Sequence, residues 1–133
     1  MIVLDVSAVL ELLLATKKGK AVAKKIAASS VSLCAPHLID LEVAQVLRRY
    51  ARNRTIDDLR GRQALRDLAE LDLVRYSHEP LLPRIWAMRD QLTAYGAAYV
   101  ALAEILGARL FSCDAKLMNA AGQRVRVELI GST

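Results

Sequence analysis

The sequence is poor in residues that crosslink a chain or anchor it in a membrane. Its two cysteines, Cys34 and Cys113, are far apart and lack a CxxC spacing, so we expect free thiols rather than a disulfide framework or a zinc site. No apolar run reaches the ~18 residues that a membrane span needs. Residues 1–5 lack the basic segment and cleavage site of a signal peptide. We therefore expect a cytoplasmic protein that does not use a membrane.

Signatures of several common enzyme classes are also missing. The sequence contains neither GxGxxG nor GxxxxGK[ST], which excludes the usual phosphate-binding loops of nucleotide-binding proteins. It has no GxSxG, the turn that carries the nucleophile of many serine hydrolases. His37 and His78 have no metal-ligand spacing. These absences leave carboxylates as the main candidates for chemistry.

The composition is that of one globular domain. Hydrophobic residues make up 54% of the 133 residues but aromatic residues only 5%, so the core must be built from aliphatic side chains. A chain of this length can bury such a core without crosslinks. No repeat, low-complexity stretch or linker divides it, and we predict a single domain over residues 1–133.

The chain is basic, and its positive charge is clustered. Lys and Arg number 19 against 14 Asp and Glu, and the pI is about 9.5. Such clusters suit RNA, DNA or an acidic protein partner, although a solvated helix face explains either cluster taken alone equally well. The sequence of the clusters does not indicate base stacking. They comprise Lys17, Lys18, Lys20, Lys24 and Lys25, and Arg48, Arg49, Arg52, Arg54, Arg60, Arg62 and Arg66.

Short apolar runs alternate with helical patterns along the chain. This alternation predicts an α/β fold, a three-layer sandwich of about five mostly parallel strands with helices on both faces. The expected strands cover residues 2–4, 31–35, 73–76, 109–112 and 125–129. The expected helices cover residues 8–15, 20–28, 43–50, 55–71, 80–90, 93–107 and 115–121. Ser7, Thr55 and Thr93 are the expected caps, and the 93–107 helix is expected to bury a stripe ending at Ile105.

Three acidic residues follow the ends of expected strands. Asp5 leaves the first strand, Asp114 follows the fourth, and Glu42 lies in the first turns of the helix after the second. Ligands of open parallel sheets bind at this edge, so the three acids can converge there. Converging carboxylates repel one another unless a cation lies between them, and Mg²⁺ or Mn²⁺ at such a site could activate water for phosphodiester hydrolysis. Each acid alone also fits a helix cap or a dipole partner, so spacing by itself does not establish a nuclease.

Four segments together resemble a known family. They are residues 1–8, residues 35–49, residues 89–104 and residues 110–117. In this order and spacing they resemble PIN-domain proteins, and in particular the VapC ribonuclease toxins of VapBC toxin–antitoxin pairs. The resemblance covers nearly the whole chain.

The resemblance implies a PIN-like fold and a Mg²⁺- or Mn²⁺-dependent endoribonuclease. Proteins of this kind cut cellular RNA, commonly tRNA or rRNA, and block translation. A VapB-type antitoxin neutralises them, DNA is bound only indirectly through the antitoxin, and a homodimer is typical. Carried over to this chain, the metal-site and catalytic acids are Asp5, Glu42 and Asp114, and the substrate-binding residues are Ser7, Ser112, Arg48 and Arg49. Ser112 stands where the family often has Thr.

The chain departs from the family pattern at Gly96. The family reads Tyr-Asp-Ala where this chain reads Tyr95-Gly96-Ala97, and that aspartate is normally a principal metal ligand. Asp90 and Glu104 lie about 9 and 12 Å away along a helix at ~1.5 Å per residue, too far to replace it. We therefore expect weak metal binding and slow or absent cleavage.

Several explanations of the glycine stay open. It could have been introduced to make a toxic protein expressible, or it could be natural and leave a weak site with three acids. Alternatively, the chain could be a non-catalytic PIN-fold module that binds RNA or an antitoxin. A nuclease directed at DNA, or a phosphatase on a similar sheet, is a further alternative.

Overall fold

The fold is built on one parallel sheet of five strands. The computed structural model describes residues 1–122 and 124–131. The strands are β1 (Ile2–Leu4), β2 (Leu33–Pro36), β3 (Leu73–Tyr76), β4 (Arg109–Ser112) and β5 (Val127–Leu129), in the order β3-β2-β1-β4-β5. All four neighbouring pairs are parallel, which confirms the predicted sheet. β2 and β5 each begin two residues later than predicted.

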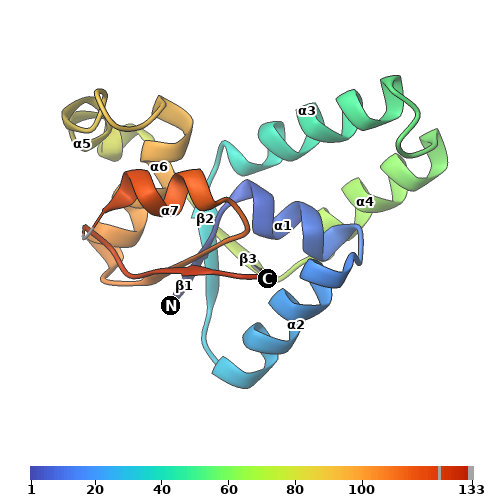
Figure 1. The fold of residues 1–133 in the computed structure, drawn as a ribbon, viewed down its shortest axis with the longest axis horizontal. Helices are drawn as coiled ribbons and strands as arrows, with labels where there is room; N and C mark the ends of the chain where they lie inside the picture. The colour runs from blue at the N-terminus through green and yellow to red at the C-terminus, as the bar shows by residue number, and fades with distance from the viewer. Residues whose placement is uncertain (123, 132–133) are drawn as a thin grey trace.

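Within the described residues, seven α-helices and one 3-10 turn connect the strands. Right-handed crossovers place α1 to α4 on one face of the sheet and α5 to α7 on the other (Figure 1). The helices are α1 (Val6–Leu13), α2 (Lys17–Ser29), α3 (Ile39–Arg52), α4 (Asp58–Glu70), α5 (Leu82–Ala87), α6 (Ala94–Leu106) and α7 (Ala115–Ala121), with the 3-10 turn η1 (Glu79–Leu81) before α5. Among the described residues, no helix has the length and apolar character needed to cross a membrane.

Two of the predicted helix caps are wrong, and in both cases a nearby aspartate takes the position. Asp5, not Ser7, caps α1, because its carboxylate accepts the backbone N–H of Ala8 at 2.9 Å. Asp57, not Thr55, caps α4, because its carboxylate accepts the backbone N–H of Arg60, the third residue of the helix. Aspartate and serine or threonine are near-equal caps, so two such residues two positions apart leave the sequence ambiguous.

Helix α6 is the buried centre of the fold. Its predicted ends are confirmed, with Thr93 as the N-cap and Gly107 in the left-handed region at φ +60°. All residues from Ala97 to Ala103 are buried, so the helix is enclosed on every side rather than along one stripe. The predicted end of that stripe is therefore wrong, because Ile105 is 62% exposed.

Both cysteines are free, as predicted. Cys34 is buried in β2, whereas Cys113 is only half-buried. Burial raises the pKa of the Cys113 thiol to about 11. Because the thiolate is the reactive form, Cys113 is a poor nucleophile near neutral pH.

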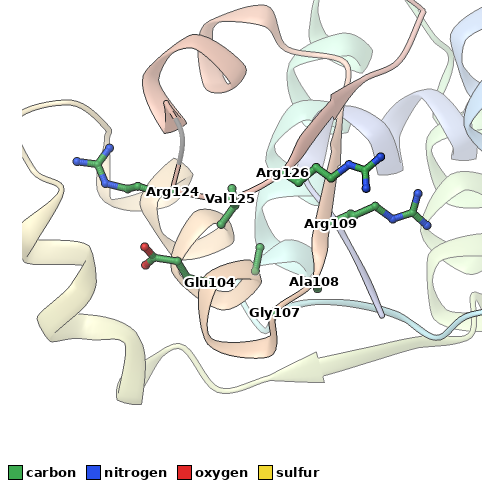
Figure 2. A pocket seen from close by; sticks show the side chains of 8 residues that line it. Glu104, Gly107, Ala108, Arg109, Arg124, Val125 and Arg126 are labelled. Carbon is green, nitrogen blue, oxygen red and sulfur yellow. The ribbon is translucent and has the colours of Figure 1, made fainter.

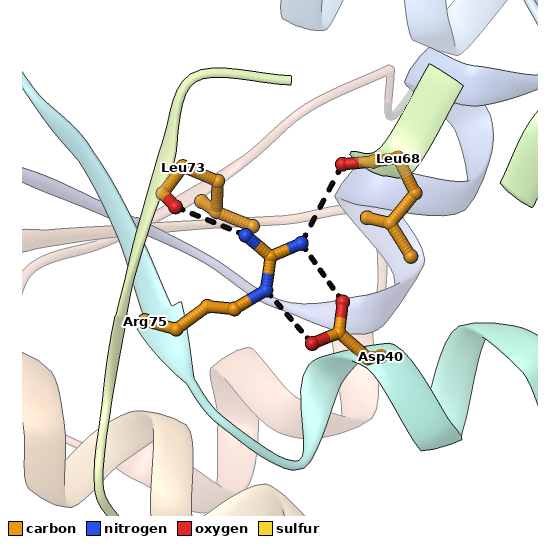
Figure 3. A network of polar contacts seen from close by, with 4 residues as sticks. All are labelled: Asp40, Leu68, Leu73 and Arg75. Atoms are coloured by element: carbon orange, nitrogen blue, oxygen red, sulfur yellow. Dashed lines mark hydrogen bonds and ion pairs between the residues drawn. The ribbon is translucent and has the colours of Figure 1, made fainter. Parts of the chain in front are cut away.

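The side chain of Arg75 ties three elements together beside the start of α3. Its Nε and Nη2 atoms each donate to the carboxylate of Asp40 at 2.8 Å, and its other donors reach the backbone oxygens of Leu73 and Leu68 (Figure 3). Asp40 is half-exposed, and both of its carboxylate oxygens accept hydrogen bonds from Arg75. The contact joins β3 and the end of α4 to the first turn of α3, which also carries Glu42.

Candidate active site

The carboxyl ends of β1 and β4 bring Asp5 and Ser112 together. Leu4 pairs with Phe111 in the parallel ladder, so the next residue of each strand lies at the same edge of the sheet. Ser112 Oγ donates to Asp5 Oδ2 at 2.5 Å, and both residues are buried. A carboxylate is therefore held inside the protein at the edge where ligands of parallel sheets bind.

Two further donors fix the other oxygen of Asp5. Ser7 Oγ donates to Oδ1 at 2.6 Å, and the Ala8 backbone N–H donates to the same atom at 2.9 Å. Ser7 Oγ in turn accepts the backbone N–H of Cys113 at 2.9 Å. The two predicted serines thus lie against the predicted catalytic aspartate and orient it. Their contact with substrate stays a prediction.

Asp114 lies beside this group and caps the next helix. Its backbone N–H donates to Ser112 Oγ at 2.9 Å, and its Oδ1 accepts the N–H of Lys116 at 2.9 Å. The side chain is exposed. The helix-capping alternative considered for Asp114 is therefore present, and it leaves the second carboxylate oxygen toward solvent.

Glu42 is held by a residue that the sequence did not single out. Tyr99, a buried residue of α6, donates its hydroxyl to Glu42 Oε1 at 2.7 Å. The only available signal was that Tyr99 lies within the segment that resembles the family. A tyrosine in an apolar helix is indistinguishable from core until its hydroxyl partner is known.

The electrostatics couple Asp5 to both of the other acids. Burial raises the pKa of Asp5, the hydrogen bonds from Ser112 and Ser7 lower it in part, and the charge of Asp114 raises it further. Burial also raises the pKa of Glu42, the Tyr99 hydroxyl lowers it in part, and the charge of Asp5 raises it. The charge on one acid therefore favours the protonated form of its neighbour.

The carboxylates nevertheless do not form a complete metal cage. Within residues 1–122 and 124–131, no group of three or more His, Cys, Asp or Glu side chains lies close enough together to hold a metal ion. The three predicted acids share one edge of the sheet without gathering at one point. Carboxylate oxygens still suit Mg²⁺, which often binds only one or two carboxylates together with water and substrate phosphate. The donors present fit an incomplete magnesium site.

Gly96 faces the start of α7, the helix that Asp114 caps. A Cβ atom built on Gly96 would lie 3.3 Å from Leu117 Cδ1 and 3.5 Å from Thr93 Oγ1. Leu117 lies in the first turn of α7, the helix that Asp114 caps. The described glycines with positive φ do not include Gly96, so the backbone at this position does not require glycine.

The two arginines expected to bind substrate lie on α3, on the side of the helix that carries Glu42 or next to it. Arg49 and Glu42 line the same hollow, of about 560 Å³, and Arg48 lines an adjoining one. Both arginines are exposed. Their position agrees with a role in substrate binding, which stays a prediction.

A further arginine-lined hollow lies at the opposite edge of the sheet. It has a volume of about 340 Å³ and adjoins the start of β4, whereas the active-site residues follow the ends of the strands. Figure 2 shows that Arg109 and Arg126 point one way and Arg124 another. Glu104 nearby is paired with Arg84 at 2.8 Å. The guanidinium groups do not converge on one point. Because the hollow lies at the start of β4 and the active-site residues follow the strand ends, it is not part of the candidate active site.

Replacing Asp5 by asparagine is expected to change how the stability of the protein depends on pH. Because burial raises its pKa, the stability that protonated Asp5 contributes is present below its unfolded pKa of about 3.9 and is lost as pH rises through the folded pKa. Asp5→Asn, measured by urea unfolding in EDTA, should therefore gain stability relative to the unsubstituted chain as pH rises from 4 to 8. Asp5→Ala is the control, because it leaves the serine hydroxyls without their acceptor. A stability difference between Asp5→Asn and the unsubstituted chain that does not change with pH would contradict a raised pKa.

Comparison with known proteins gives one consistent result. A family model described as the PIN domain matches residues 2–123. Ribonuclease VapC12 of Mycobacterium tuberculosis is 36% identical over 130 residues, which cover 98% of this chain and 99% of that protein. Ribonuclease VapC9 of the same species is 40% identical over 119 residues, 90% of each chain.

Two solved structures have a similar fold. PAE2754 from Pyrobaculum aerophilum superposes with a TM-score of 0.69 at 23% identity, over 95% of this chain and 89% of that one. VapC20 of Mycobacterium tuberculosis, described as a toxin that cleaves the sarcin-ricin loop, gives a TM-score of 0.69 at 13% identity, over 95% and 99%. At these identities the likeness concerns the fold alone.

Proposed function

This chain belongs to the PIN domain family, among the VapC ribonucleases, and we propose that it is a metal-dependent endoribonuclease toxin that cuts cellular RNA and blocks translation, with an activity that is reduced or lost because Gly96 replaces a metal-binding aspartate. The observation that carries the proposal is the buried carboxylate of Asp5, which accepts hydrogen bonds from Ser7, Ala8 and Ser112 at the ligand-binding edge of the sheet. A protein gains no stability by burying a charge with a raised pKa, so its retention there favours a chemical role. tRNA or rRNA is the proposed substrate.

The proposed cofactor is Mg²⁺ or Mn²⁺, with Asp5 as its principal ligand and Glu42 and Asp114 as the further acids of the site. When bound, the ion would activate water and offset the charge of the scissile phosphate. Ser7 and Ser112 hold the Asp5 carboxylate in one orientation, and Tyr99 holds Oε1 of Glu42. Glu42, held through Oε1 by Tyr99, is the acid that we propose accepts a proton from the attacking water.

The proposed protein partner is a VapB-type antitoxin, and DNA would be bound only through it. This partnership and a homodimeric state are supported by membership of the family. Both are directly measurable, the first by co-purification with a VapB-type protein and the second by light scattering.

The second candidate function is a non-catalytic PIN-fold module that binds RNA or an antitoxin. Two observations favour it. Glycine occupies position 96, and no group of three metal-binding side chains is present in residues 1–122 and 124–131. A binding module would need no metal, which separates the two candidates experimentally.

The test is RNA cleavage by the unsubstituted chain and by Gly96→Asp, in Mn²⁺, in Mg²⁺ and in EDTA. We expect internal cuts in RNA by Gly96→Asp with metal, weak or no cutting by the unsubstituted chain, and none in EDTA. The inactive control is the double variant Gly96→Asp with Asp5→Asn, which should lose about 100-fold or more in rate, because outer groups of metal sites alone cost 10- to 100-fold and Asp5 is a proposed direct ligand. Cleavage that persists in EDTA, or an absence of cleavage by both proteins, would contradict the proposed enzyme.

A further inference from the structure

The side chain of Lys18, in the first turn of α2, is packed against the chain that follows β5. A Cβ atom built on Gly131 would lie 2.5 Å from Lys18 Cγ and 3.1 Å from both Cβ and Cδ of the same side chain. The aliphatic stem of Lys18 therefore lies directly across the backbone of Gly131, at a distance that only glycine allows. Because Lys18 is exposed overall, this packing of the stem leaves the ammonium group open to solvent.

The backbone that carries Lys18 is held in place as well. A Cβ atom built on Gly19 would lie 1.9 Å from the backbone oxygen of Glu11, so α1 and α2 approach each other more closely than a Cβ atom would permit. Thr16 caps α2 by accepting the N–H of Gly19 at 3.0 Å, and its hydroxyl donates to the Glu11 carboxylate. Because α1 begins directly after Asp5, these contacts fix the first turn of α2 relative to the candidate active site.

The end of β5 places Lys18 at the edge of the sheet where the acids lie. Ser112 pairs with Leu129 in the parallel ladder, and its backbone oxygen accepts the N–H of Ile130 at 2.8 Å. Gly131 is the next residue, so the stem of Lys18 crosses the chain just beyond the carboxyl end of β5. In Figure 1 this end of β5 lies beside the turn between α1 and α2.

The charge of Lys18 acts on the strand end next to the active site. Burial and the charges of Asp5 and Glu11 raise the pKa of the Cys113 thiol to about 11, and the charge of Lys18 opposes them. Ser7 connects Cys113 to the buried acid, because its Oγ accepts the N–H of Cys113 and donates to Asp5. Lys18 is thus a cation beside the active site rather than inside it.

The ammonium group of Lys18 is available to an anion. Among residues 1–122 and 124–131, no carboxylate lies within salt-bridge distance of it, whereas Lys25 of the same helix is paired with Glu128 at 3.2 Å. The arginines of α3 follow β2, and Gly131 follows β5, so the two sets of cations lie on opposite sides of β1 in the strand order. A chain of phosphates that crosses this edge of the sheet would meet positive charge on both sides of Asp5.

We propose that Lys18 binds a phosphate of the RNA chain that flanks the cut, on the β5 side of the active site. This inference rests on the proposed ribonuclease function and adds a substrate-binding residue to it. A lysine whose stem is already packed loses less side-chain entropy when its ammonium group binds than a free one does. A phosphate is favoured over the carboxylate of an acidic peptide, because the RNA backbone joins it covalently to the phosphate at the acids.

The first test is the salt dependence of binding to a short single-stranded RNA in EDTA, where we expect no cleavage. Lys18→Met removes the charge and keeps an unbranched apolar stem over Gly131. Loss of one phosphate contact should lower the slope of log affinity against log salt by about 0.7, which corresponds to about 5-fold weaker binding at about 0.1 M salt. Lys18→Arg should keep the original slope. Lys24→Ala is the matched control, because Lys24 is exposed and lies about 9 Å further along α2.

The second test is a double-variant cycle on the packing of Lys18 against Gly131. Gly131→Ala places a methyl group against Lys18 Cγ and should displace the ammonium group, so it should weaken RNA binding as Lys18→Met does. The double variant should bind no more weakly than either single variant, because both changes remove the same contact. Gly107→Ala is the matched control for backbone strain, since φ is +60° there and +77° at Gly131, but nothing lies within 4 Å of the added Cβ. It should lose stability without losing RNA affinity.

The third test uses the kinetics of the Gly96→Asp protein in Mn²⁺ to separate binding from chemistry. Adding Lys18→Met should raise KM for RNA by about 5-fold at about 0.1 M salt and leave kcat within about twofold, because a flanking contact is made equally before and during the reaction. A lower kcat at unchanged KM would contradict a role in binding.

Three further results would overturn the inference: an unchanged salt slope for Lys18→Met, additive effects of Lys18→Met and Gly131→Ala, or Lys18-dependent binding that is tighter for an oligoglutamate peptide than for RNA. The failure of the ribonuclease proposal looks different. Lys18-dependent RNA binding in EDTA without cleavage by Gly96→Asp in Mn²⁺ would support the Lys18 contact and contradict the enzyme. Cleavage by Gly96→Asp with RNA affinity and KM unaffected by Lys18→Met would do the reverse.

Discussion

Gly96→Asp is expected to raise the rate of Mn²⁺-dependent RNA cleavage by about 100-fold or more over the unsubstituted chain. The new carboxylate would project from the first turn of α6 toward Leu117 in the first turn of α7, the helix that Asp114 caps. It would add an acid to the edge of the sheet where the charge of Asp114 already raises the pKa of Asp5. Outer groups of metal sites alone change affinity 10- to 100-fold, and a direct ligand should do at least as much.

The fold should accept this substitution. The backbone of Gly96 is helical, and the closest contact of an added Cβ is the flexible end of Leu117, at 3.3 Å. The third position of a helix also favours a negative charge, by about 0.3–1 kcal/mol. Repulsion from the other acids opposes this gain in the absence of metal. We therefore expect the free energy of unfolding in EDTA to change by less than about 1 kcal/mol.

Metal binding gives a readout of the same substitution that does not depend on activity. Saturation at 100 times the dissociation constant stabilises a protein by about 2.7 kcal/mol. Thermal unfolding with and without Mn²⁺ should show this shift for Gly96→Asp and a much smaller one for the unsubstituted chain. Gly96→Asn is the control, since it has the same shape without the charge. If Gly96→Asn matches Gly96→Asp, the effect of position 96 is not due to a metal-binding carboxylate.

Ser112→Ala is expected to lower both stability and the activity of the Gly96→Asp protein. Ser112 is fully buried, donates to Asp5 and accepts from the backbone of Asp114. Removing the hydroxyl leaves both groups without this partner, at about 1–3 kcal/mol for each buried group. It also removes a hydrogen bond that lowers the pKa of Asp5, so less of the carboxylate would be ionised at a given pH. We expect a loss of about 3 kcal/mol in urea unfolding and of about 10- to 100-fold in rate.

The matched control for this effect is Ser112→Thr, which keeps the hydroxyl. Threonine should retain most of the activity if its methyl group is accommodated in the buried site. A rate for Ser112→Ala equal to that of the serine protein would show that orientation of Asp5 does not limit catalysis. In that case its loss of stability would be a purely structural effect.

Much of the fold could be predicted because local signals and topology agreed. The strands β3 and β4 and the helix α7 have the predicted bounds, and Thr93 and Gly107 delimit α6 as expected. The errors arose where local signals competed, as for the caps of α1 and α4. At Ile105 periodicity misled, because a helix buried on all sides has no single apolar stripe to detect.

The candidate site divides in the same way. The proximity of Asp5 and Ser112 follows from parallel pairing of the first and fourth strands, which the alternation of elements already indicated. The contacts of Glu42 with Tyr99 and of Arg49 with the hollow lined by Tyr95 depend on how α6 lies relative to α3. That arrangement is set by packing between distant segments. No spacing along the chain encodes it.

Arg75 has a consequence for how the protein would handle a polynucleotide. By joining the start of α3 to the end of α4, it closes the base of the helical hairpin that carries the arginine cluster (Figures 1 and 3). Glu42 lies at this base, in the first turn of α3, so we expect the contact to fix the position of the arginines on α3 relative to Glu42. The backbone separation between Glu42 and these arginines would then be set before any RNA arrives, so binding would not have to order the backbone of this segment.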